Sequence, residues 1–401
     1  MIKLLKNLIP RPAINYGKHL PSAVLANLRY GLPAKEMIVV GVTGTDGKTT
    51  TVNMIYQILK QAGKNVSMLS TINAVIAGQS YDTGFHVTSP SPSQLYKYIK
   101  LAKEANSKYL VLEVTSHSID QFRIWGLKFD IAVITNVTHE HLDYHKTFEN
   151  YLKVKSRLIK NSKIAVLNKD DKNFSRLSQI AKGKVVSFGL SENAEFNPSD
   201  FDIKLKLPGE FNLLNGLAAS AVAINLGIEP KTIKEALENL ATLEGRMEKI
   251  DNNLGINIVI DFAHTPAALE QALKTLKNKG KLIAVFGAAS QRDTQKRPLM
   301  GKIAADLADI IILTDEDPRF EDSLKIIDEI AVGAVEMGVT VNSNLFKQPN
   351  RREAIDLAIK MAKKGDTVVI LGKGHEKSMN YRGIEQPWSD KQQVLDILNK
   401  L

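Results

Sequence analysis

The feature of this sequence that most limits its fold is an alternation of short apolar runs with segments of helical periodicity. One series of apolar runs covers 37–42, 66–69, 109–114, 131–135 and 164–167, and a second covers 256–260, 282–286, 310–313 and 367–371. Helical patterns separate most of them, among them 49–61, 266–278, 296–308, 323–336 and 351–363. Such alternation is typical of parallel sheets covered by helices, so we predict an α/β fold.

The two series also divide the chain into domains. A length of 401 residues exceeds what one ordinary core accommodates. We predict a central domain with a mainly parallel sheet over 37–245 and a smaller, Rossmann-like domain over 246–401, with the boundary after the helical pattern at 231–240. Residues 1–36 mix short apolar stretches with proline and glycine and predict one or two short helices.

The absence of cysteine removes several classes of chemistry. With no cysteine, the chain has no disulfide, iron–sulfur cluster, thiolate zinc site or cysteine nucleophile, and any metal must bind oxygen and nitrogen. No apolar run reaches the length of about 18 residues that a membrane-spanning helix needs. The N-terminus does not resemble a cleavable signal, so we expect a cytoplasmic protein. The usual nucleic-acid-binding motifs are absent from the sequence, so we expect no nucleic-acid partner.

The charge is concentrated at the N-terminus. The net charge is +10, and residues 1–36 hold six basic residues against the single acid Glu36, which is half of that excess. A basic surface favours an anionic partner such as a phosphate, a nucleic acid or a lipid headgroup, although charge that only keeps the protein soluble is an equally good explanation.

The sharpest local motif lies at the end of the first apolar run. It reads Gly41-Val-Thr-Gly-Thr-Asp-Gly-Lys-Thr-Thr50 and leads into a helical pattern. A glycine-rich turn between strand and helix lets backbone N–H groups converge on phosphate oxygens. Lys48 is then placed to neutralise the β- and γ-phosphates, and the Thr49 hydroxyl to reach Mg²⁺. Because the usual spacing would place a glycine where Val42 stands, the motif indicates a nucleoside triphosphate but not a particular reaction.

This loop resembles the variant phosphate loop of the Mur ligase superfamily, and the resemblance continues along residues 37–401. The matching strings, in order, are Thr88-Ser-Pro, Glu113-Val-Thr-Ser-His, Thr135-Asn-Val-Thr-His-Glu-His-Leu-Asp-Tyr-His, Tyr151-Leu-Lys-Val-Lys, Leu167-Asn-Lys-Asp-Asp, Gly209-Glu-Phe-Asn-Leu-Leu-Asn, Gly245-Arg-Met-Glu, Asp261-Phe-Ala-His-Thr-Pro, Lys296-Arg-Pro-Leu-Met-Gly, Asp317-Pro-Arg and Gly372-Lys-Gly-His-Glu. HLDYH, GRME, KRPLMG and GKGHE are similar to the branch that adds the third residue of the peptidoglycan stem peptide.

The resemblance implies an ATP-dependent ligase that joins an amino acid to a carboxylate through an acyl phosphate. It implies a central P-loop ATPase domain and a C-terminal domain that closes over ATP. It also implies two Mg²⁺ ions, one held by Thr49 and Glu113 and a second that involves His141, with Lys155 carbamylated so that it offers oxygen to a cation. Taken alone, Glu113 could equally cap a helix, His141 could be a solvated loop histidine and Lys155 a surface lysine.

The remaining site residues also follow from the resemblance. Residues implied at the nucleotide are Gly44, Thr45, Asp46, Gly47, Lys48, Thr49, Thr50, Asn136, Asn212, Asn215, Arg246, Asp261 and His264. Residues implied at the muramoyl-peptide acceptor are Thr88, Ser89, Ser116, Gln121 and Arg123, and those implied at the incoming amino acid are Asp317, Arg319, Gly372 and Glu376. Where members that use meso-diaminopimelate read Asp-Asn-Pro-Arg, this chain has Asp317 in place of asparagine, and we expect diaminopimelate or lysine as the substrate.

The segment before the loop departs from the family pattern. A member of the family has roughly a hundred residues there, in a domain that binds the UDP group, whereas about 36 residues precede the loop here. We expect the basic segment 1–36 to bind a diphosphate directly or to contact a membrane peripherally, in a protein that is otherwise monomeric. The acceptor therefore stays open: a lipid-linked muramoyl peptide, a folate or a polyamino acid is an alternative, as is a nucleotide-binding partner subunit without catalysis.

Overall fold

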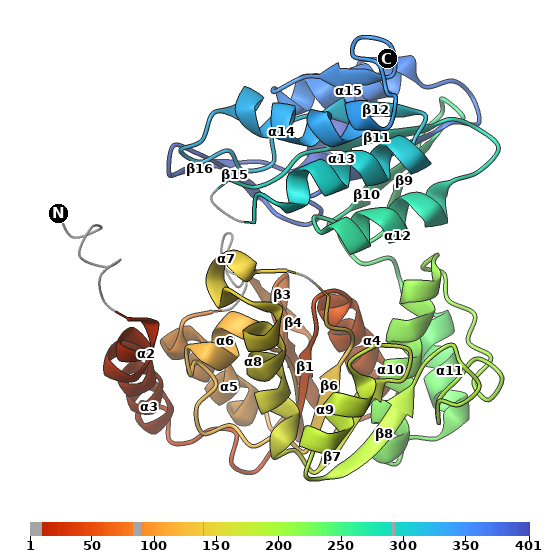
Figure 1. The fold of residues 1–401 in the computed structure, drawn as a ribbon. Helices are drawn as coiled ribbons and strands as arrows, with labels where there is room; N and C mark the ends of the chain where they lie inside the picture. The colour runs from red at the N-terminus through yellow and green to blue at the C-terminus, as the bar shows by residue number, and fades with distance from the viewer. Residues whose placement is uncertain (1–9, 83–89, 139, 291–292) are drawn as a thin grey trace. The chain divides into compact units, whose positions relative to one another are not determined.

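The computed structural model describes residues 10–82, 90–138, 140–290 and 293–401, which form two compact units (Figure 1). The first unit contains the chain up to His139 together with His145–Lys206 and Phe211–Leu240. The second contains Ala241–Leu401 and two short segments, Glu140–Tyr144 and Leu207–Glu210.

The first unit is built on an eight-stranded sheet with the strand order β4-β3-β2-β5-β1-β6-β7-β8. The strands are β1 (Ile38–Thr43), β2 (Val66–Leu69), β3 (Asn73–Ile76), β4 (Gln79–Asp82), β5 (Tyr109–Glu113), β6 (Ile131–Ile134), β7 (Ile164–Asn168) and β8 (Lys184–Phe188). All neighbouring pairs are parallel except β2–β3 and β3–β4. The prediction of a mainly parallel sheet is confirmed.

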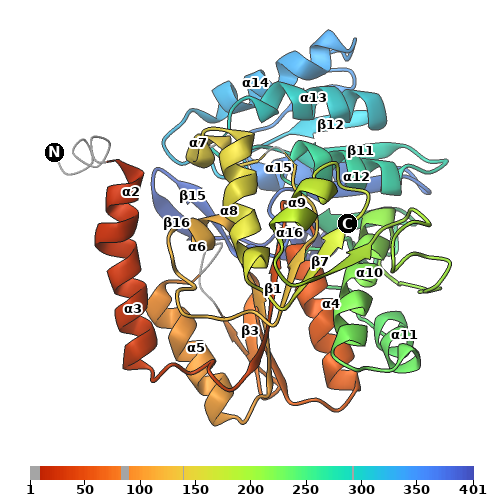
Figure 2. The same ribbon diagram turned by 60° about the horizontal axis from the view of Figure 1, so that its bottom comes forward.

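Helices cover this sheet on both sides. They are α4 (Lys48–Gln61), α5 (Pro92–Glu104), α6 (Ser116–Asp120), α8 (Phe148–Lys160), α9 (Phe174–Ile180), α10 (Glu210–Asn225) and α11 (Pro230–Glu238), and the short α7 (Leu142–His145) precedes α8. The N-terminal segment forms α2 (Arg11–Ile14), a π-helical turn η1 (Asn15–His19) and α3 (Leu20–Arg29), which follow one another without a break (Figure 2). In the described part of the chain, no helix has the length and apolarity needed to cross a bilayer.

The second unit has a six-stranded sheet with the order β13-β12-β11-β14-β10-β9, in which only β9 is antiparallel to its neighbour. Its strands are β9 (Glu248–Ile250), β10 (Asn257–Asp261), β11 (Leu282–Phe286), β12 (Ile310–Leu313), β13 (Leu345–Lys347) and β14 (Thr367–Leu371), with a separate hairpin of β15 (Ser378–Tyr381) and β16 (Ile384–Pro387). The helices are α12 (Pro266–Leu276), α13 (Lys296–Leu307), α14 (Ser323–Glu336), α15 (Arg351–Met361) and α16 (Asp390–Leu398).

Apolar strands form a core in each unit, and polar residues follow where the strands end. Val39, Leu110 and Ala132 are buried in the first core, and Ile260, Val285 and Ile370 in the second. In an open parallel sheet, ligands bind beyond the carboxyl ends of the strands. At that edge of the first sheet, β1 runs into the glycine-rich loop, β5 ends at Glu113 and β6 ends just before Thr135 and Asn136.

Helices α13 and α14 approach each other at two glycines. A Cβ added at Gly301 would lie 2.0 Å from the Ile330 carbonyl oxygen, and one added at Gly333 would lie 1.8 Å from the Pro298 carbonyl oxygen. Because both neighbours are backbone atoms, the helices would have to separate to admit a side chain. The glycine of the KRPLMG string is thus explained by helix packing.

We expect Gly333→Ala to lower the free energy of unfolding by about 1–3 kcal/mol, as overpacking does in well-packed interiors. Urea unfolding checks this. Gly17→Ala is the control, because nothing lies within 4 Å of a Cβ at Gly17, and this variant should keep or slightly increase stability. An unchanged midpoint for Gly333→Ala would show that the helix pair adapts freely.

Candidate active site

The loop between β1 and α4 has the shape of a phosphate cradle. Gly47, the N-cap of α4, has a φ of +80°, and a Cβ there would lie 2.3 Å from Oδ1 of Asn215 on α10. A residue with a side chain would therefore be strained and would clash at this position. No side chain caps the first turn of α4, which leaves the N–H groups at its start, from Lys48 onward, to face an anion.

Side-chain donors bind three consecutive carbonyl groups of this loop. The Nζ of Lys155 donates to the Gly44 carbonyl at 2.6 Å, and the Nζ of Lys48 donates to the Thr45 carbonyl at 2.8 Å. The Asp46 carbonyl accepts from Thr135 Oγ1 at 2.6 Å and from Asn136 Nδ2 at 3.2 Å. These side-chain donors hydrogen-bond to the carbonyl oxygens and so neutralise the negative ends of the peptide dipoles in the loop.

Glu113 accepts three hydrogen bonds on one oxygen. Its Oε2 lies 2.9 Å from the Thr49 hydroxyl, and the Thr71 N–H and hydroxyl donate to the same atom at 3.0 and 3.2 Å. Glu113 is buried. The alternative that Glu113 caps a helix is wrong, because the carboxylate contacts the side chain of the phosphate loop and a loop threonine instead.

This pair of oxygen donors fits a divalent cation. The Thr49 hydroxyl and the Glu113 carboxylate meet at a point next to the loop, and Mg²⁺ prefers hard oxygen ligands. Within the described ranges, no three histidine, aspartate or glutamate side chains converge on one point. Mg²⁺ that also binds substrate phosphates and water commonly takes only one or two ligands from the protein.

Lys155 is buried beside the phosphate loop. Its Nζ lies 4.6 Å from the centre of the Tyr151 ring, and the Tyr151 hydroxyl is 3.2 Å from Thr45 Oγ1. The alternative of a surface lysine is therefore wrong. The carbamylation of Lys155 stays a prediction, and its position beside Gly44 places any added carboxylate close to the loop.

Asparagines from two elements contact the loop. Asn136 Oδ1 accepts from the Asp46 N–H at 3.0 Å, and Asn215 Oδ1 accepts from the Thr51 hydroxyl at 3.2 Å. Asn212 lies one turn earlier on α10, and its Oδ1 is 3.4 Å from Asn215 Nδ2. The structure thus places both α10 asparagines on the loop side of the first unit, while their contact with adenine stays a prediction.

The structure describes three of the five residues predicted for the acceptor, namely Ser116, Gln121 and Arg123. Gln121 and Arg123 lie together, since Gln121 Oε1 accepts from Arg123 Nε at 3.0 Å and Nη2 at 2.7 Å. Thr88 and Ser89 lie outside the described residues. Ser116, at the start of α6, is buried.

His145 of the HLDYH string contacts Ser116, and no separate role was predicted for this histidine. His145 Nε2 lies 3.0 Å from Ser116 Oγ. Burial lowers the pKa of His145 to about 4, while Asp120 opposes the shift. The imidazole is therefore neutral at pH 7 and can orient the Ser116 hydroxyl.

His141, predicted as a ligand of a second Mg²⁺, has a left-handed backbone with a φ of +57°, and its Nδ1 lies 3.9 Å from Glu140 Oε1.

In the second unit, the residues predicted for the nucleotide gather around Phe262. Asp261, at the end of β10, accepts from the Met247 N–H at 2.7 Å. The Arg246 guanidinium lies 4.5 Å from the Phe262 ring, and the His264 ring is 4.5 Å from it. The Nδ1 of His264 donates to the Phe262 carbonyl at 2.9 Å. Arg246, Asp261 and His264 thus come together.

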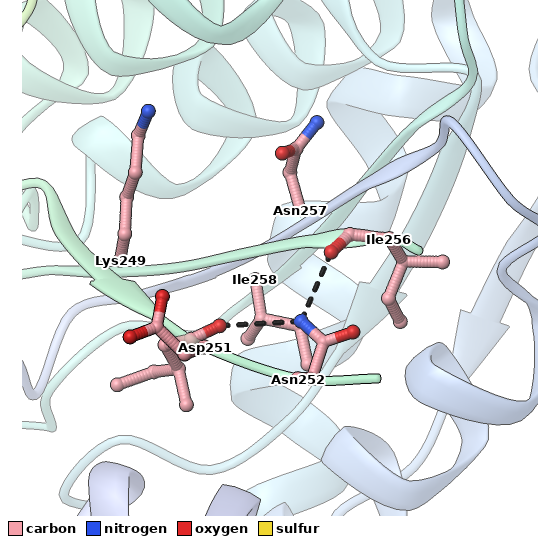
Figure 3. A pocket seen from close by; sticks show the side chains of 7 residues that line it. Lys249, Asp251, Asn252, Ile256, Asn257 and Ile258 are labelled. Carbon is pink, nitrogen blue, oxygen red and sulfur yellow. Dashed lines mark hydrogen bonds between the residues drawn. The ribbon is translucent and has the colours of Figure 1, made fainter. Parts of the chain in front are cut away.

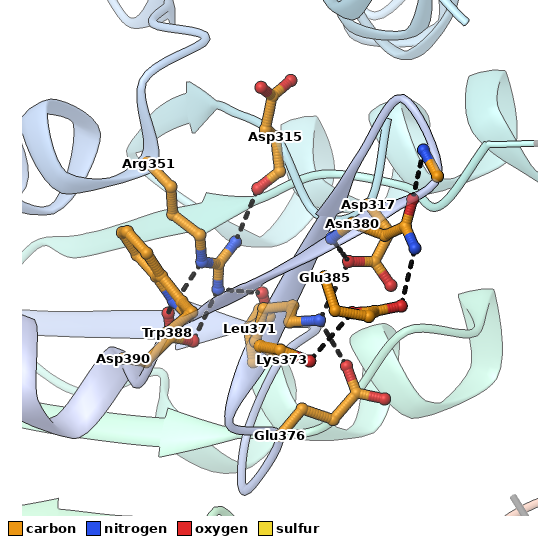
Figure 4. Close-up of polar contacts among 12 residues, drawn as sticks. Asp315, Asp317, Arg351, Leu371, Lys373, Glu376, Asn380, Glu385, Trp388 and Asp390 are labelled. Atoms are coloured by element: carbon orange, nitrogen blue, oxygen red, sulfur yellow. Dashed lines mark hydrogen bonds and ion pairs between the residues drawn. The ribbon is translucent and has the colours of Figure 1, made fainter. Parts of the chain in front are cut away.

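An ionic cluster joins the residues predicted for the incoming amino acid. The Nζ of Lys373 lies 3.1 Å from Asp317 Oδ1 and 2.5 Å from Glu376 Oε2, and all three side chains are drawn in Figure 4. Lys373 is completely buried. It was missed as a site residue, although it lies within the GKGHE string, because only the fold brings it to Asp317. Arg319 has a φ of +50°, and its backbone pairs with β15.

Glu316 is a second residue that sequence reasoning missed. Its carboxylate is buried and faces the backbone of Gly372, where an added Cβ would lie 2.8 Å from Oε2. Among the described residues, Oε2 has no hydrogen-bond partner. Burial raises the pKa of Glu316 to about 7, and the Asp317 and Glu376 carboxylates also raise it, whereas Lys296 and Lys373 oppose them.

This shift predicts a loss of stability as the pH rises. Between the ordinary pKa of 4.5 and about 7, native Glu316 holds a proton that the unfolded chain releases. The free energy of unfolding therefore falls through this window and is constant above it. We expect Glu316→Gln to remove that fall. In urea unfolding, the free energy of unfolding of the variant relative to that of the native protein should therefore be higher at pH 8 than at pH 5. An equal difference at both pH values would contradict the assignment.

A shallow pocket lies at the edge strand of the second sheet and contains none of the predicted site residues. It is lined by Lys249, Ile250, Asp251, Asn252, Ile256, Asn257 and Ile258 (Figure 3). The Asn252 amide donates to the carbonyls of Ile250 and Ile256 at 3.2 and 3.0 Å, which closes the turn between β9 and β10. The pocket is thus explained by a structural turn.

Comparison with known proteins identifies the family. The model of the Mur ligase middle domain matches residues 42–223, and the model described as Mur ligase, glutamate ligase domain matches residues 245–374. The UDP-N-acetylmuramoyl-L-alanyl-D-glutamate–2,6-diaminopimelate ligase of Parabacteroides distasonis is 37% identical over 397 residues, which cover 94% of this chain and 81% of that protein. The chain belongs to the Mur ligase family. It is therefore an ATP-dependent acid–amino-acid ligase.

Two further members show the same breadth of similarity to this Mur ligase. The UDP-N-acetylmuramyl-tripeptide synthetase of Roseiflexus sp. is 35% identical over 431 residues, covering 98% of this chain and 85% of that protein. The solved structure of a UDP-N-acetylmuramoyl-L-alanyl-D-glutamate–2,6-diaminopimelate ligase superposes with a TM-score of 0.61 at 28% identity, covering 97% of this chain and 83% of that one. The resemblance read from the sequence is confirmed.

Proposed function

We propose that this Mur ligase adds the third residue of the peptidoglycan stem peptide. In this proposal it joins a diamino acid, meso-diaminopimelate or lysine, to a muramoyl-dipeptide acceptor. The observation that carries it is the ionic cluster of Asp317, Lys373 and Glu376 beside Arg319, in a chain whose relatives are named for 2,6-diaminopimelate. A zwitterionic side chain needs both a cation and carboxylates for recognition.

The first step would transfer the γ-phosphoryl group of ATP to the acceptor. An acceptor carboxylate oxygen forms a bond to the γ-phosphorus, the bond to the β-phosphate oxygen breaks, and ADP leaves with that electron pair. The N–H groups at the start of α4 and the Nζ of Lys48 bind the phosphates. Arg123 and Ser116 would hold the acceptor, with His145 fixing the Ser116 hydroxyl.

The second step would form the amide bond. The amine of the incoming amino acid attacks the acyl carbon, a tetrahedral intermediate forms, and phosphate leaves as the amine loses its proton. Arg319 would bind a distal carboxylate, and Glu376 an ammonium group. Because Lys373 already neutralises Asp317, the aspartate at position 317 adds less negative charge to the site than the sequence alone indicates.

Cations are required because three anionic groups meet in the reaction. Thr49 and Glu113 would hold one Mg²⁺, and His141 and a carbamylated Lys155 would serve a second. When bound, Mg²⁺ supplies charge stabilisation at the phosphoryl group. Arg246, Asp261 and His264 would contact the nucleotide, with Asn136, Asn212 and Asn215 beside the loop.

We further propose a cytoplasmic monomer whose residues 1–36 contact a membrane peripherally.

The test is a ligation assay with ATP, Mg²⁺ and UDP-N-acetylmuramoyl-dipeptide, with diaminopimelate, lysine or no amino acid added. Phosphate release and product mass are measured together. We expect a tripeptide product with one of the two amino acids and little phosphate release without either. A product only with a lipid-linked muramoyl peptide would change the acceptor. No product with any of these acceptors, from protein that binds ATP, would overturn the proposal.

A further inference from the structure

Helix α3 exposes two of its three leucines and buries its asparagine. Leu25 and Leu28 are 67% and 56% exposed, whereas Asn27 is 2% exposed and Ala26 lies in the core of the first unit. This is the reverse of a surface helix in a globular protein, where the apolar side faces the core. Leu25, Leu28 and Arg29 are spaced three and four residues apart, so they share the outer side of the helix.

Polar contacts fix this orientation. The Asn27 amide donates to the Trp125 carbonyl at 3.1 Å, and the Asn15 amide donates to the carbonyl and the Oδ2 of Asp120, both at 3.0 Å. The Tyr16 ring lies 5.2 Å from the Phe122 ring. Helix α3 runs along α5 at the edge of the first unit (Figures 1 and 2). The helix cannot turn its leucines inward without breaking these bonds.

Among the described residues of the first unit, the exposed large apolar side chains lie on the N-terminal helical segment or next to it. Within the described residues of that unit, they are Tyr16, Leu25, Leu28, Leu32 and Trp125, which we call the N-terminal face. The Trp125 carbonyl receives the Asn27 amide on the buried side of α3, so Trp125 lies next to this helix. Exposed leucines one turn apart on the same side of a helix, in a unit with few other exposed apolar side chains among its described residues, indicate an interaction site.

The charge around the N-terminal face selects the partner. Residues 1–36 carry six basic side chains and one acid, and Lys18, Arg29 and Lys35 are exposed. A second copy of the chain would bring the same excess of positive charge to the contact, which opposes self-association. Leucines with aromatic rings and basic side chains on one helix are typical of segments that lie in the interface of an anionic bilayer.

We propose that the N-terminal face docks this ligase on the surface of an anionic lipid bilayer. Leu25 and Leu28 enter the boundary between headgroups and acyl chains, and Lys18 and Arg29 contact the headgroup phosphates. The inference rests on the membrane contact included in the proposed function and names its partner as anionic lipid. It does not depend on which acceptor or amino acid the enzyme uses.

The test is flotation of the full-length protein with vesicles of phosphatidylglycerol and phosphatidylcholine, against vesicles of phosphatidylcholine alone. We expect binding to the anionic vesicles only, and weaker binding as salt is added. Leu25→Gln/Leu28→Gln should lower the partition coefficient at least tenfold. Leu299→Gln/Leu324→Gln is the matched control, because these leucines of the second unit are 48% and 51% exposed, and it should bind like the native protein.

The outcomes separate this inference from the ligase proposal. Both pairs change exposed side chains, so ligation of a dissolved acceptor should be unchanged in each, and a loss of ligation with intact vesicle binding would concern the ligase proposal alone. Equal partition of the Leu25→Gln/Leu28→Gln variant and the native protein would overturn the docking. So would a vesicle-free dimer, seen by sedimentation, that the same variant dissociates.

Discussion

Replacing Glu113 by glutamine should lower kcat by about 10²–10³-fold and raise the Mg²⁺ concentration needed for half-maximal rate about tenfold. Glutamine keeps an oxygen that accepts from Thr49 and Thr71, so the loop is preserved while the negative charge is lost. The measurement is phosphate release against Mg²⁺ concentration, alongside urea unfolding to show that the variant is folded.

Asp130→Asn is the matched control for Glu113→Gln. Asp130 is a carboxylate of the same unit that accepts from the Val39 N–H at 2.9 Å, but it precedes β6 and so lies at the opposite end of the parallel strands. Asparagine keeps this acceptor, and we expect kcat and the Mg²⁺ requirement to stay within about twofold of the native values. Equal losses in both variants would show that Glu113 acts only through stability.

The second large effect is on stability and concerns the buried pair of Arg351 and Asp390 (Figure 4). Arg351 Nε and Nη2 donate to the two Asp390 oxygens at 2.7 and 2.6 Å, and Nη2 also donates to the Leu371 carbonyl at 2.9 Å. Asp390→Ala leaves this guanidinium buried without its counter-charge. We expect the free energy of unfolding of the second unit to fall by about 3–5 kcal/mol.

Trp388 fluorescence during urea unfolding measures this change, because the Trp388 indole N–H donates to Asp390 Oδ1 at 2.8 Å. Asp396→Ala is the control. Asp396 lies on the same helix and pairs with Arg352 at 3.9 Å near the surface, so its loss should cost about 0–1 kcal/mol. A double variant, Arg351→Met/Asp390→Leu, should recover most of the stability. If it does not, the packing around the pair and not its charge is responsible.

Short apolar runs that alternate with helical patterns made the central strands predictable. The runs at 66–69 and 282–286 became β2 and β11 with the same bounds, and the helical pattern at 323–336 became α14. Strands β3, β4, β15 and β16 were not predicted, because they are short, contain polar residues and are stabilised by pairing with a neighbour in a hairpin. The edge strands β8, β9 and β13 were not predicted either. The π-helical turn at Asn15–His19 was not predicted either, because no periodic pattern in the sequence indicates it.

Local motifs and the family resemblance predicted most residues of the candidate site, and the tertiary contacts added others. The phosphate loop could be predicted because strand, glycines and helix follow one another in the sequence. Thr71 could not, since it reaches Glu113 from a separate loop. Glu316 and Lys373 lie inside or beside recognised strings, yet their importance comes from burial and from each other's charges, which a single sequence does not display.

The side-chain donors on Gly44, Thr45 and Asp46 have a thermodynamic consequence. Lys155 holds the Gly44 carbonyl from α8, and Thr135 and Asn136 hold the Asp46 carbonyl from the end of β6, so the loop has its shape before nucleotide arrives. Little conformational entropy then remains to be lost on binding. ATP should bind without a rearrangement of the loop, and hydrogen exchange of the amides in β1 should be nearly unchanged by the nucleotide. Selectivity for the triphosphate would then come from a preorganised loop and not from a loop that folds around its ligand.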